Sequence, residues 1–216
     1  EFALSMARIE HRMGIRSTYF VMLRSPLYNL MGRHGSWCLR ELVQLGHEIG
    51  LHFDASCECG PRWSLGDWVR FELSMLGGLV GREVTAMSLH QPTPNVIEAR
   101  LTVPGVVNTY HPEHMAGFHY LSDSNRDWRG RDPLCVASSH QRLQLLLHPM
   151  WWMCDGSIDD CWNTALRHGF ENAQNQLLAT ERAYGGMRTM SLAPAETPAN
   201  SMAANGARRD LAGDER

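Results

Sequence analysis

The sequence predicts one α/β domain built on parallel strands. Helical and strand-like segments alternate along most of the chain, as they do in folds with parallel sheets. Three of the strand-like segments end in a histidine, at the position where the loops of such folds gather around a site. With 216 residues, 44% of them hydrophobic and 20% charged, the chain is long enough to bury a core as a single domain.

The first half of the chain alternates between helix and strand. The opening segment EFALSMARIEHRMG has apolar residues at helical spacing, and IRSTYFVML then forms a β-branched and aromatic run that predicts a buried strand. A helix from about 37 to 45 follows, and Gly46 is suited to cap its C-terminus before the strand HEIGLHF. A helix from about 65 to 79 then leads to the strand EVTAMSLH.

The second half adds short strands and a long helix. GVVNTY, FHYLSDS and RLQLLLHP read as strands, and a helix from about 158 to 184 closes the domain. From about Met187 the chain is rich in Ala, Pro, Asn and Gly and has few large apolar residues. We therefore expect an α/β domain over residues 1–186 and a disordered tail over residues 187–216.

The composition excludes several classes of function. A net charge of -3 offers no basic surface for nucleic acid, and no apolar run reaches the roughly 18 residues that cross a membrane. No signal peptide is visible, so we expect a cytoplasmic protein that binds neither nucleic acid nor membrane. Lysine is absent, which excludes Schiff-base and Walker A chemistry.

The six cysteines form no CxxC pair, and most of them are interpreted as buried thiols. Cys57 and Cys59 form the one close pair that could supply soft metal ligands, beside the loop that follows His52.

Histidines mark three strand ends. His52, His90 and His148 each end a predicted strand, and the turn-like stretches FDAS, QPTP and PMWW follow them. Strand ends of this kind meet at one edge of a parallel sheet, so we expect the three side chains to converge on a polar site. His47 lies five residues before His52, which excludes the zinc-protease spacing H-E-x-x-H, and we interpret it as structural.

Four blocks of sequence resemble the polysaccharide deacetylase (NodB-homology) superfamily, in a divergent branch. GIRSTYFV is similar to its second strand, GHEIGLH to its histidine motif, SDSNRDW to its acidic and tryptophan motif, and LQLLLHP to its last histidine motif. Together the blocks span about Met13 to Trp152. The alternative for SDSNRDWRGRD is a solvated surface loop.

The resemblance implies a deformed (β/α) barrel that holds one divalent metal, usually zinc. It makes His52 a metal ligand and His148 the acid near the leaving group, with Asp123 as its catalytic partner. The substrate would be a carbohydrate or another N-acylated small molecule. Its expected contacts come from three aromatic residues, Tyr120, Trp128 and Trp151, although a tryptophan after a buried strand can equally pack against the closing helix.

The sequence departs from the family pattern at two places. Ser56 stands where the family has a second histidine, so we expect Asp54 and His90 to complete the ligand set with His52. The alternative for His90 is a hydrogen bond within its own turn. The family's paired aspartates would precede Glu1, so we expect a fragment that lacks the first strand and has little activity as given.

The leading functional hypothesis is a metal-dependent hydrolase that cleaves a non-peptide carbon-nitrogen bond, by N-deacetylation of a sugar or glycan precursor. The alternative is a non-catalytic barrel that binds carbohydrate or serves as a structural or interaction domain.

Overall fold

The computed structural model describes residues 1–56 and 63–183. The chain divides into a unit of residues 1–178 and a unit of residues 179–216, and the sheets and sites below all belong to the first unit. The expected tail, residues 187–216, and the Cys57 and Cys59 pair lie outside the described residues.

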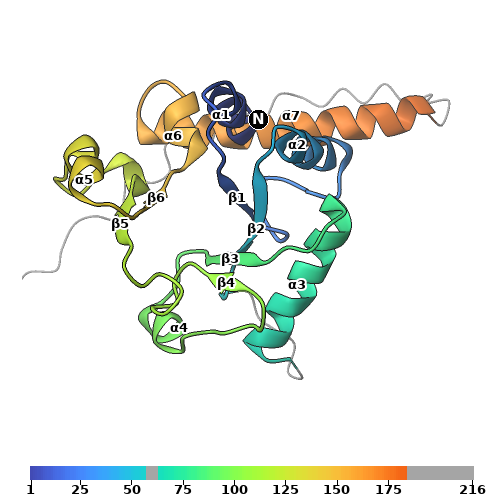
Figure 1. Ribbon diagram of the computed structural model, residues 1–216. Coiled ribbons are helices and arrows are strands. Elements are labelled where there is room, and N and C mark those ends of the chain that lie inside the picture. Colours follow the sequence, from blue (N-terminus) through green and yellow to red (C-terminus); the bar gives the residue numbers. More distant parts are fainter. Residues whose placement is uncertain (57–62, 184–216) are drawn as a thin grey trace, which may run out of the picture. The chain divides into compact units, whose positions relative to one another are not determined.

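The strands form two parallel sheets, so the expected α/β class with parallel strands is present (Figure 1). The larger sheet has the order β1 (Thr18–Val21), β2 (Glu48–Phe53), β3 (Ala86–Leu89) and β4 (Val107–Asn108). The smaller sheet pairs β5 (His119–Ser122) with β6 (Leu143–Leu146).

The expected helices frame the larger sheet. α1 (Phe2–Arg12) precedes β1, α2 (Arg33–Gln44) connects β1 to β2, and α3 (Leu65–Val80) connects β2 to β3. The long closing helix is α7 (Ile158–Ala183). Among the described residues, no helix combines the length and the apolar character that crossing a membrane requires.

Short helices that the sequence did not predict follow several strands. They are α4 (Pro94–Glu98), a 3-10 turn (Ser124–Arg126), α5 (Pro133–Ser139) and α6 (Pro149–Met153). The stretch PMWW after His148 was expected to be a turn, but it forms α6, with Pro149 in the first helical turn where a missing N–H costs nothing. α6 packs against α1.

One side-chain hydrogen bond connects the two sheets. The side-chain amide of Gln144, on β6, donates to the carbonyl of Thr109, just after β4, over 3.4 Å.

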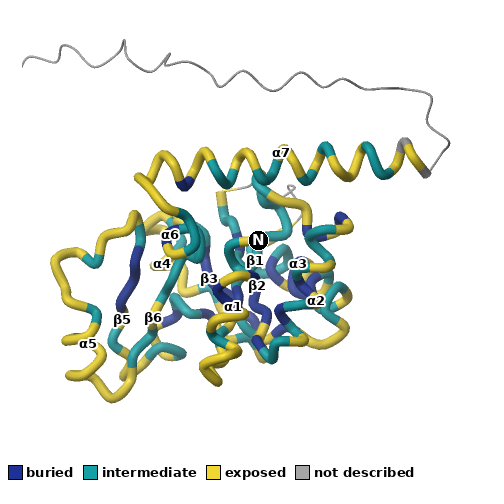
Figure 2. Tube along the Cα trace, turned by 90° about the horizontal axis from the view of Figure 1, so that it is seen from above, coloured by how far each residue is buried: buried dark blue, intermediate teal, exposed yellow. Residues whose placement is uncertain are grey.

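The core surrounds β2 and β3, where the trace in Figure 2 is most continuously buried. Leu51, Phe53 and Met87 are completely enclosed, as expected for strands that a parallel sheet buries on both faces. Gly50 is required in this strand because a Cβ there would come within 2.5 Å of the Phe20 ring. Gly46 has a φ of +87° and follows α2, in the capping role expected from the sequence.

His47 is a structural histidine, as interpreted from the sequence. It is fully buried, its Nδ1 accepts the backbone N–H of Ser17 over 3.2 Å, and its Nε2 donates to the carbonyl of Ala7 over 3.0 Å. These partners fix a neutral imidazole with the proton on Nε2 and tie α1 to the start of β2.

Candidate functional site

Two histidines meet at the carboxyl ends of β2 and β3. The Nε2 atom of His52 and the Nδ1 atom of His90 are 3.2 Å apart, and the two rings are nearly perpendicular. The parallel register places His52 opposite Ser88, so its other nitrogen, Nδ1, lies 3.3 Å from the Ser88 hydroxyl. The expected convergence of His52 and His90 is therefore present.

The backbone holds His90 in this position. Its N–H donates to the carbonyl of Phe53 over 2.8 Å, which extends the pairing of β2 with β3 by one step. This bond places His90 beside the end of β2, where its ring faces His52.

The surroundings of His52 keep its imidazole neutral. Its pKa is lowered to about 4, chiefly by burial and to a smaller extent by the neighbouring His90 and His148, against an opposing effect of Asp54. At neutral pH the ring therefore has one unprotonated nitrogen, which can accept a proton or bind a metal ion.

A second pair lies at the ends of β5 and β6. Asp123 follows β5 and His148 follows β6, and the Asp123 carboxylate accepts a bond from the His148 Nδ1 over 2.6 Å. The same carboxylate accepts the backbone N–H of His148 over 3.0 Å and the indole N–H of Trp152 over 2.7 Å. Asp123 is buried, so these bonds replace the contacts with water that its carboxyl group lacks.

This arrangement orients the His148 ring. Because Nδ1 faces the carboxylate, Nε2 points away from Asp123, and the side chain is 40% exposed. A histidine held by a buried carboxylate with its second nitrogen accessible has the geometry of a general acid or base. The charge of His148 contributes to the lowered pKa of His52.

Asp54 contributes to the turn after β2. Its Oδ1 atom accepts the backbone N–H of Ser56 over 2.9 Å and the Ser56 hydroxyl over 2.7 Å. Within residues 1–56 and 63–183, no three His, Cys, Asp or Glu side chains are grouped closely enough to hold a metal ion. The structure thus brings together two of the three expected ligands, His52 and His90.

A buried ion pair beside this turn was not identified from the sequence. The Nε atom of Arg24 donates to the Glu72 carboxylate over 2.6 Å, and its Nη2 donates to the Asp54 carbonyl over 2.9 Å. The guanidinium also lies over the rings of Phe53 and Trp68. Burial raises the pKa of Glu72, although Arg24 lowers it. The one sequence feature that could have indicated this ion pair is Glu72, a glutamate inside the apolar run of α3.

Two of the three expected substrate contacts line one pocket. This pocket has a volume of about 200 Å³ and is formed by Tyr120, Leu121, Ser122, Trp128, Arg129 and Arg131. Trp128 packs edge-on against Trp152, with ring centroids 6.3 Å apart. The third expected contact, Trp151, is buried between His148 and Trp162.

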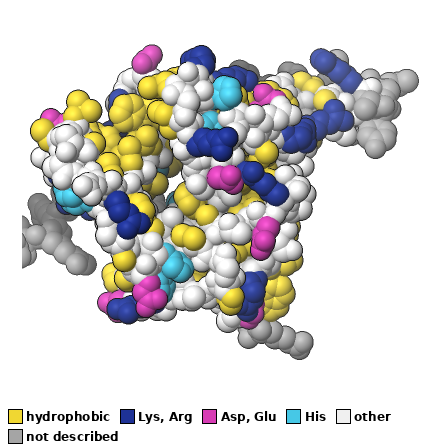
Figure 3. Space-filling view, in the orientation of Figure 1, with side chains coloured by type: hydrophobic (Ala, Val, Ile, Leu, Met, Phe, Trp, Pro, Cys, Tyr) yellow, Lys and Arg dark blue, Asp and Glu magenta, His cyan; other side chains and the backbone are white. Residues whose placement is uncertain are grey.

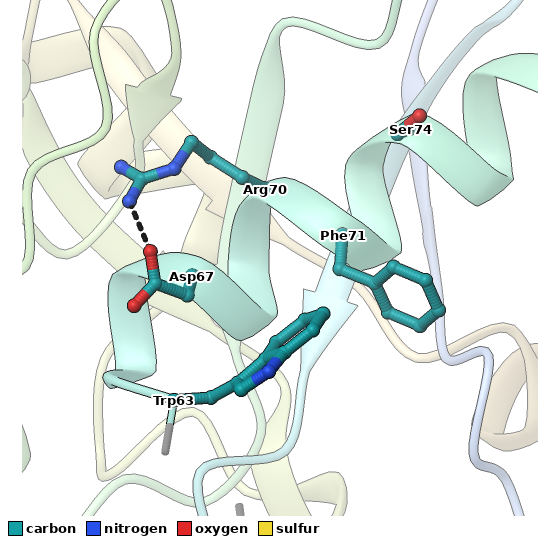
Figure 4. A pocket seen from close by; sticks show the side chains of 5 residues that line it. All are labelled: Trp63, Asp67, Arg70, Phe71 and Ser74. Atoms are coloured by element: carbon teal, nitrogen blue, oxygen red, sulfur yellow. Dashed lines mark hydrogen bonds and ion pairs between the residues drawn. The ribbon is translucent and has the colours of Figure 1, made fainter.

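A larger and more open pocket, of about 530 Å³, lies along α3 (Figure 4). Trp63 and Phe71 meet edge to face within it, and Arg70 and Asp67 form an ion pair of 2.5 Å across its rim. The Arg70 guanidinium in this pocket is therefore already paired with a carboxylate of the same chain.

No protein-family model matches this chain, and a search of curated proteins finds no match to it.

Proposed function

We propose that this protein is a metal-dependent hydrolase that removes the acyl group from an N-acylated sugar or glycan precursor. The proposal includes the finer form of the fold, a deformed (β/α) barrel, in which the two parallel sheets are parts of one strand array. One observation supports it: each of the two parallel sheets carries a polar pair at the carboxyl ends of its strands, His52 with His90 and Asp123 with His148.

The histidine pair suits a zinc ion. Two nitrogen ligands at about 2.0–2.1 Å from a tetrahedral zinc lie roughly 3.3 Å apart, close to the 3.2 Å between His52 Nε2 and His90 Nδ1. In this proposal Asp54, two residues after His52, is the third ligand and gives up its bonds to Ser56. A bound metal supplies a water of lowered pKa and stabilises the oxyanion that forms during amide hydrolysis.

In this proposal the Asp123 and His148 pair transfers a proton. Asp123 accepts the bond from the His148 Nδ1, which directs Nε2 away from the carboxylate to where it can deliver a proton to the departing amine. The indole N–H of Trp152 holds the carboxylate in place for this role. Tyr120 and Trp128 would form the wall against which the sugar ring lies.

The test is release of acetate from N-acetylated sugars by the protein with added zinc, with the His52→Ala variant measured in parallel. We expect slow turnover that a chelator abolishes and zinc restores, and we expect the variant to lose both this turnover and bound zinc. Exposed His140 offers a matched control, because it precedes β6 and so lies at the opposite end of that strand from His148. Equal turnover by wild type and His52→Ala would refute the proposal.

The second candidate is a non-catalytic domain that binds carbohydrate. Two hydrogen bonds from Ser56 to the Asp54 carboxylate favour this candidate, because they give Asp54 a structural role in the turn in place of metal binding. In the same assay this candidate predicts sugar binding without acetate release.

A further inference from the structure

The pocket beside the Asp123 and His148 pair carries two arginines and no acid. Its lining residues are Tyr120, Leu121, Ser122, Trp128, Arg129 and Arg131. The pocket adjoins the candidate site through Trp128, which packs on Trp152, the residue whose indole N–H binds Asp123.

The two guanidinium groups form no ion pair with any carboxylate in the described part of the chain. The nearby acids have other uses: Asp127 accepts the backbone N–H of Arg129 over 2.7 Å, and Asp132 caps α5 by accepting the N–H of Leu134 over 2.8 Å. One Arg131 nitrogen donates weakly to the Tyr120 carbonyl over 3.4 Å, which keeps this guanidinium beside the pocket. Two arginines therefore line a small pocket without a direct ion pair to either nearby acid.

The loop fixes Arg129 in an unusual backbone conformation. Its φ is +55°, a left-handed value that residues with side chains seldom adopt, and the bond from its N–H to Asp127 stabilises it. Arg126 in the same loop is also left-handed, and its guanidinium binds the Gly156 carbonyl, which anchors the loop to the segment before α7. The loop thus sets the backbone position from which the exposed Arg129 side chain extends.

We propose that this pocket binds an oxyanion group, a phosphate or a carboxylate, carried by the sugar on which the enzyme acts. The planar guanidinium groups of Arg129 and Arg131 match the geometry of such groups, and Trp128 and Tyr120 offer aromatic faces to a sugar ring. The inference that the ligand is the substrate rests on the proposed function.

The size of the pocket and the spread of charge favour a small anion over a polyanion. A volume of about 200 Å³ accommodates one anionic group with part of a ring. On the face shown in Figure 3, arginine side chains are scattered among hydrophobic and neutral ones, whereas a nucleic-acid surface gathers them into a continuous basic stripe.

The test is equilibrium binding to four probes at low ionic strength: N-acetylglucosamine 6-phosphate, glucuronate, neutral N-acetylglucosamine and inorganic phosphate. We expect the wild type to bind at least one anionic sugar about tenfold or more tightly than the neutral sugar, with an affinity that falls as salt is added. The affinities for N-acetylglucosamine 6-phosphate and for glucuronate are compared to identify whether the pocket prefers phosphate or carboxylate.

Arg129→Gln and Arg131→Gln should each weaken binding of the anionic sugar by about tenfold, because each removes a charge-assisted contact. The matched control is Arg70→Gln, which changes the arginine of the other pocket and should leave binding unchanged. Circular dichroism of each variant checks that it folds. Equal affinity for charged and neutral sugars, no binding of any sugar, or equal losses in all three variants would overturn the inference.

Hydrolysis assays separate this inference from the proposed function. Deacetylation of neutral and anionic sugars with equal kcat/KM would support the proposed function and overturn the anion pocket. Anion-selective binding that depends on Arg129 and Arg131, without hydrolysis of any sugar, would support the pocket and refute the hydrolase.

Discussion

His52 is held from both sides, by Ser88 at Nδ1 and by His90 at Nε2. A neutral imidazole has a proton on only one nitrogen, so its partners decide which nitrogen offers a lone pair. If Ser88 accepts a proton from Nδ1, then Nε2 is the nitrogen free to bind a metal. Ser88 is buried on β3, so its hydroxyl acts on His52 without competition from water.

We predict that Ser88→Ala weakens zinc binding about 10- to 100-fold, the usual effect of removing a group that orients a metal-binding histidine. Ser88→Thr keeps the hydroxyl and should restore most of the affinity. Competition with a chromophoric chelator measures both variants, and Ser138→Ala, which changes an exposed serine of α5, serves as the control. Unchanged zinc affinity in Ser88→Ala would show that the hydroxyl does not orient His52.

The sequence predicted the histidines of this site and Asp123, but not Ser88. His52, His90 and His148 were recognisable because each ends a strand-like run. Ser88 carried no such signal, because a serine within a strand is common and its partner is found only once the register of β2 and β3 is known. The roles of these residues as metal ligands and acid remain predictions.

The loop after β2 depends on a buried ion pair between two elements. Glu72 lies on α3 and Arg24 follows β1, and the carboxylate is almost inaccessible to water. Removal of one partner of a buried pair is costly because the other charge stays buried and unpaired.

We therefore predict that Arg24→Met lowers the free energy of unfolding at neutral pH by about 2–4 kcal/mol. Arg70→Met, which changes an exposed arginine paired with Asp67 on the same helix, should have a much smaller effect. Urea denaturation of both variants at neutral pH provides the comparison. Equal losses in the two variants would contradict the structural role of Arg24.

The loss in Arg24→Met should also depend on pH. Burial already raises the folded-state pKa of Glu72, and removing Arg24 raises it further. A group whose pKa is higher in the folded than in the unfolded state stabilises the fold below its unfolded pKa, and this stabilisation is lost as pH rises through the folded pKa. The difference between variant and wild type should therefore be smaller at about pH 4.5 than at pH 7. A pH-independent difference would exclude Glu72 as its source.

Close packing between strands gives a prediction for two glycines. Gly50→Ala should destabilise the protein by about 1–3 kcal/mol, because its Cβ would collide with the Phe20 ring on the neighbouring strand. Gly78→Ala, in open space on α3, should instead stabilise it by about 0.5–1 kcal/mol. Thermal unfolding of the two variants tests the opposite signs, and destabilisation by both would contradict this packing.

The elements that the sequence predicted correctly are those with a long apolar pattern, such as α3 and β2. The helices α4, α5 and α6 span five to seven residues each, which is too short for a helical period to be distinguished from a turn. Each of them begins with proline, the one local signal that the sequence offered.

At the scale of the molecule, parallel strand order determines where the site forms. The carboxyl ends of β2 and β3 present one histidine pair, and those of β5 and β6 present the acid and histidine pair. The parallel α/β class was predictable from the alternation of elements. The division into two sheets was not, because it depends on which strands pair across long stretches of sequence, as β5 does with β6.

The central claim is that the two pairs act as one site, with His52 and His90 holding zinc and Asp123 and His148 moving a proton. The most direct measurement is bound zinc and deacetylation rate on the same samples of wild type, His90→Ala and His148→Ala. We predict that His90→Ala loses zinc and activity together, whereas His148→Ala keeps its zinc and loses about 10²- to 10⁴-fold in kcat. A wild type that neither retains zinc nor releases acetate, or a His148→Ala variant as active as wild type, would contradict the account.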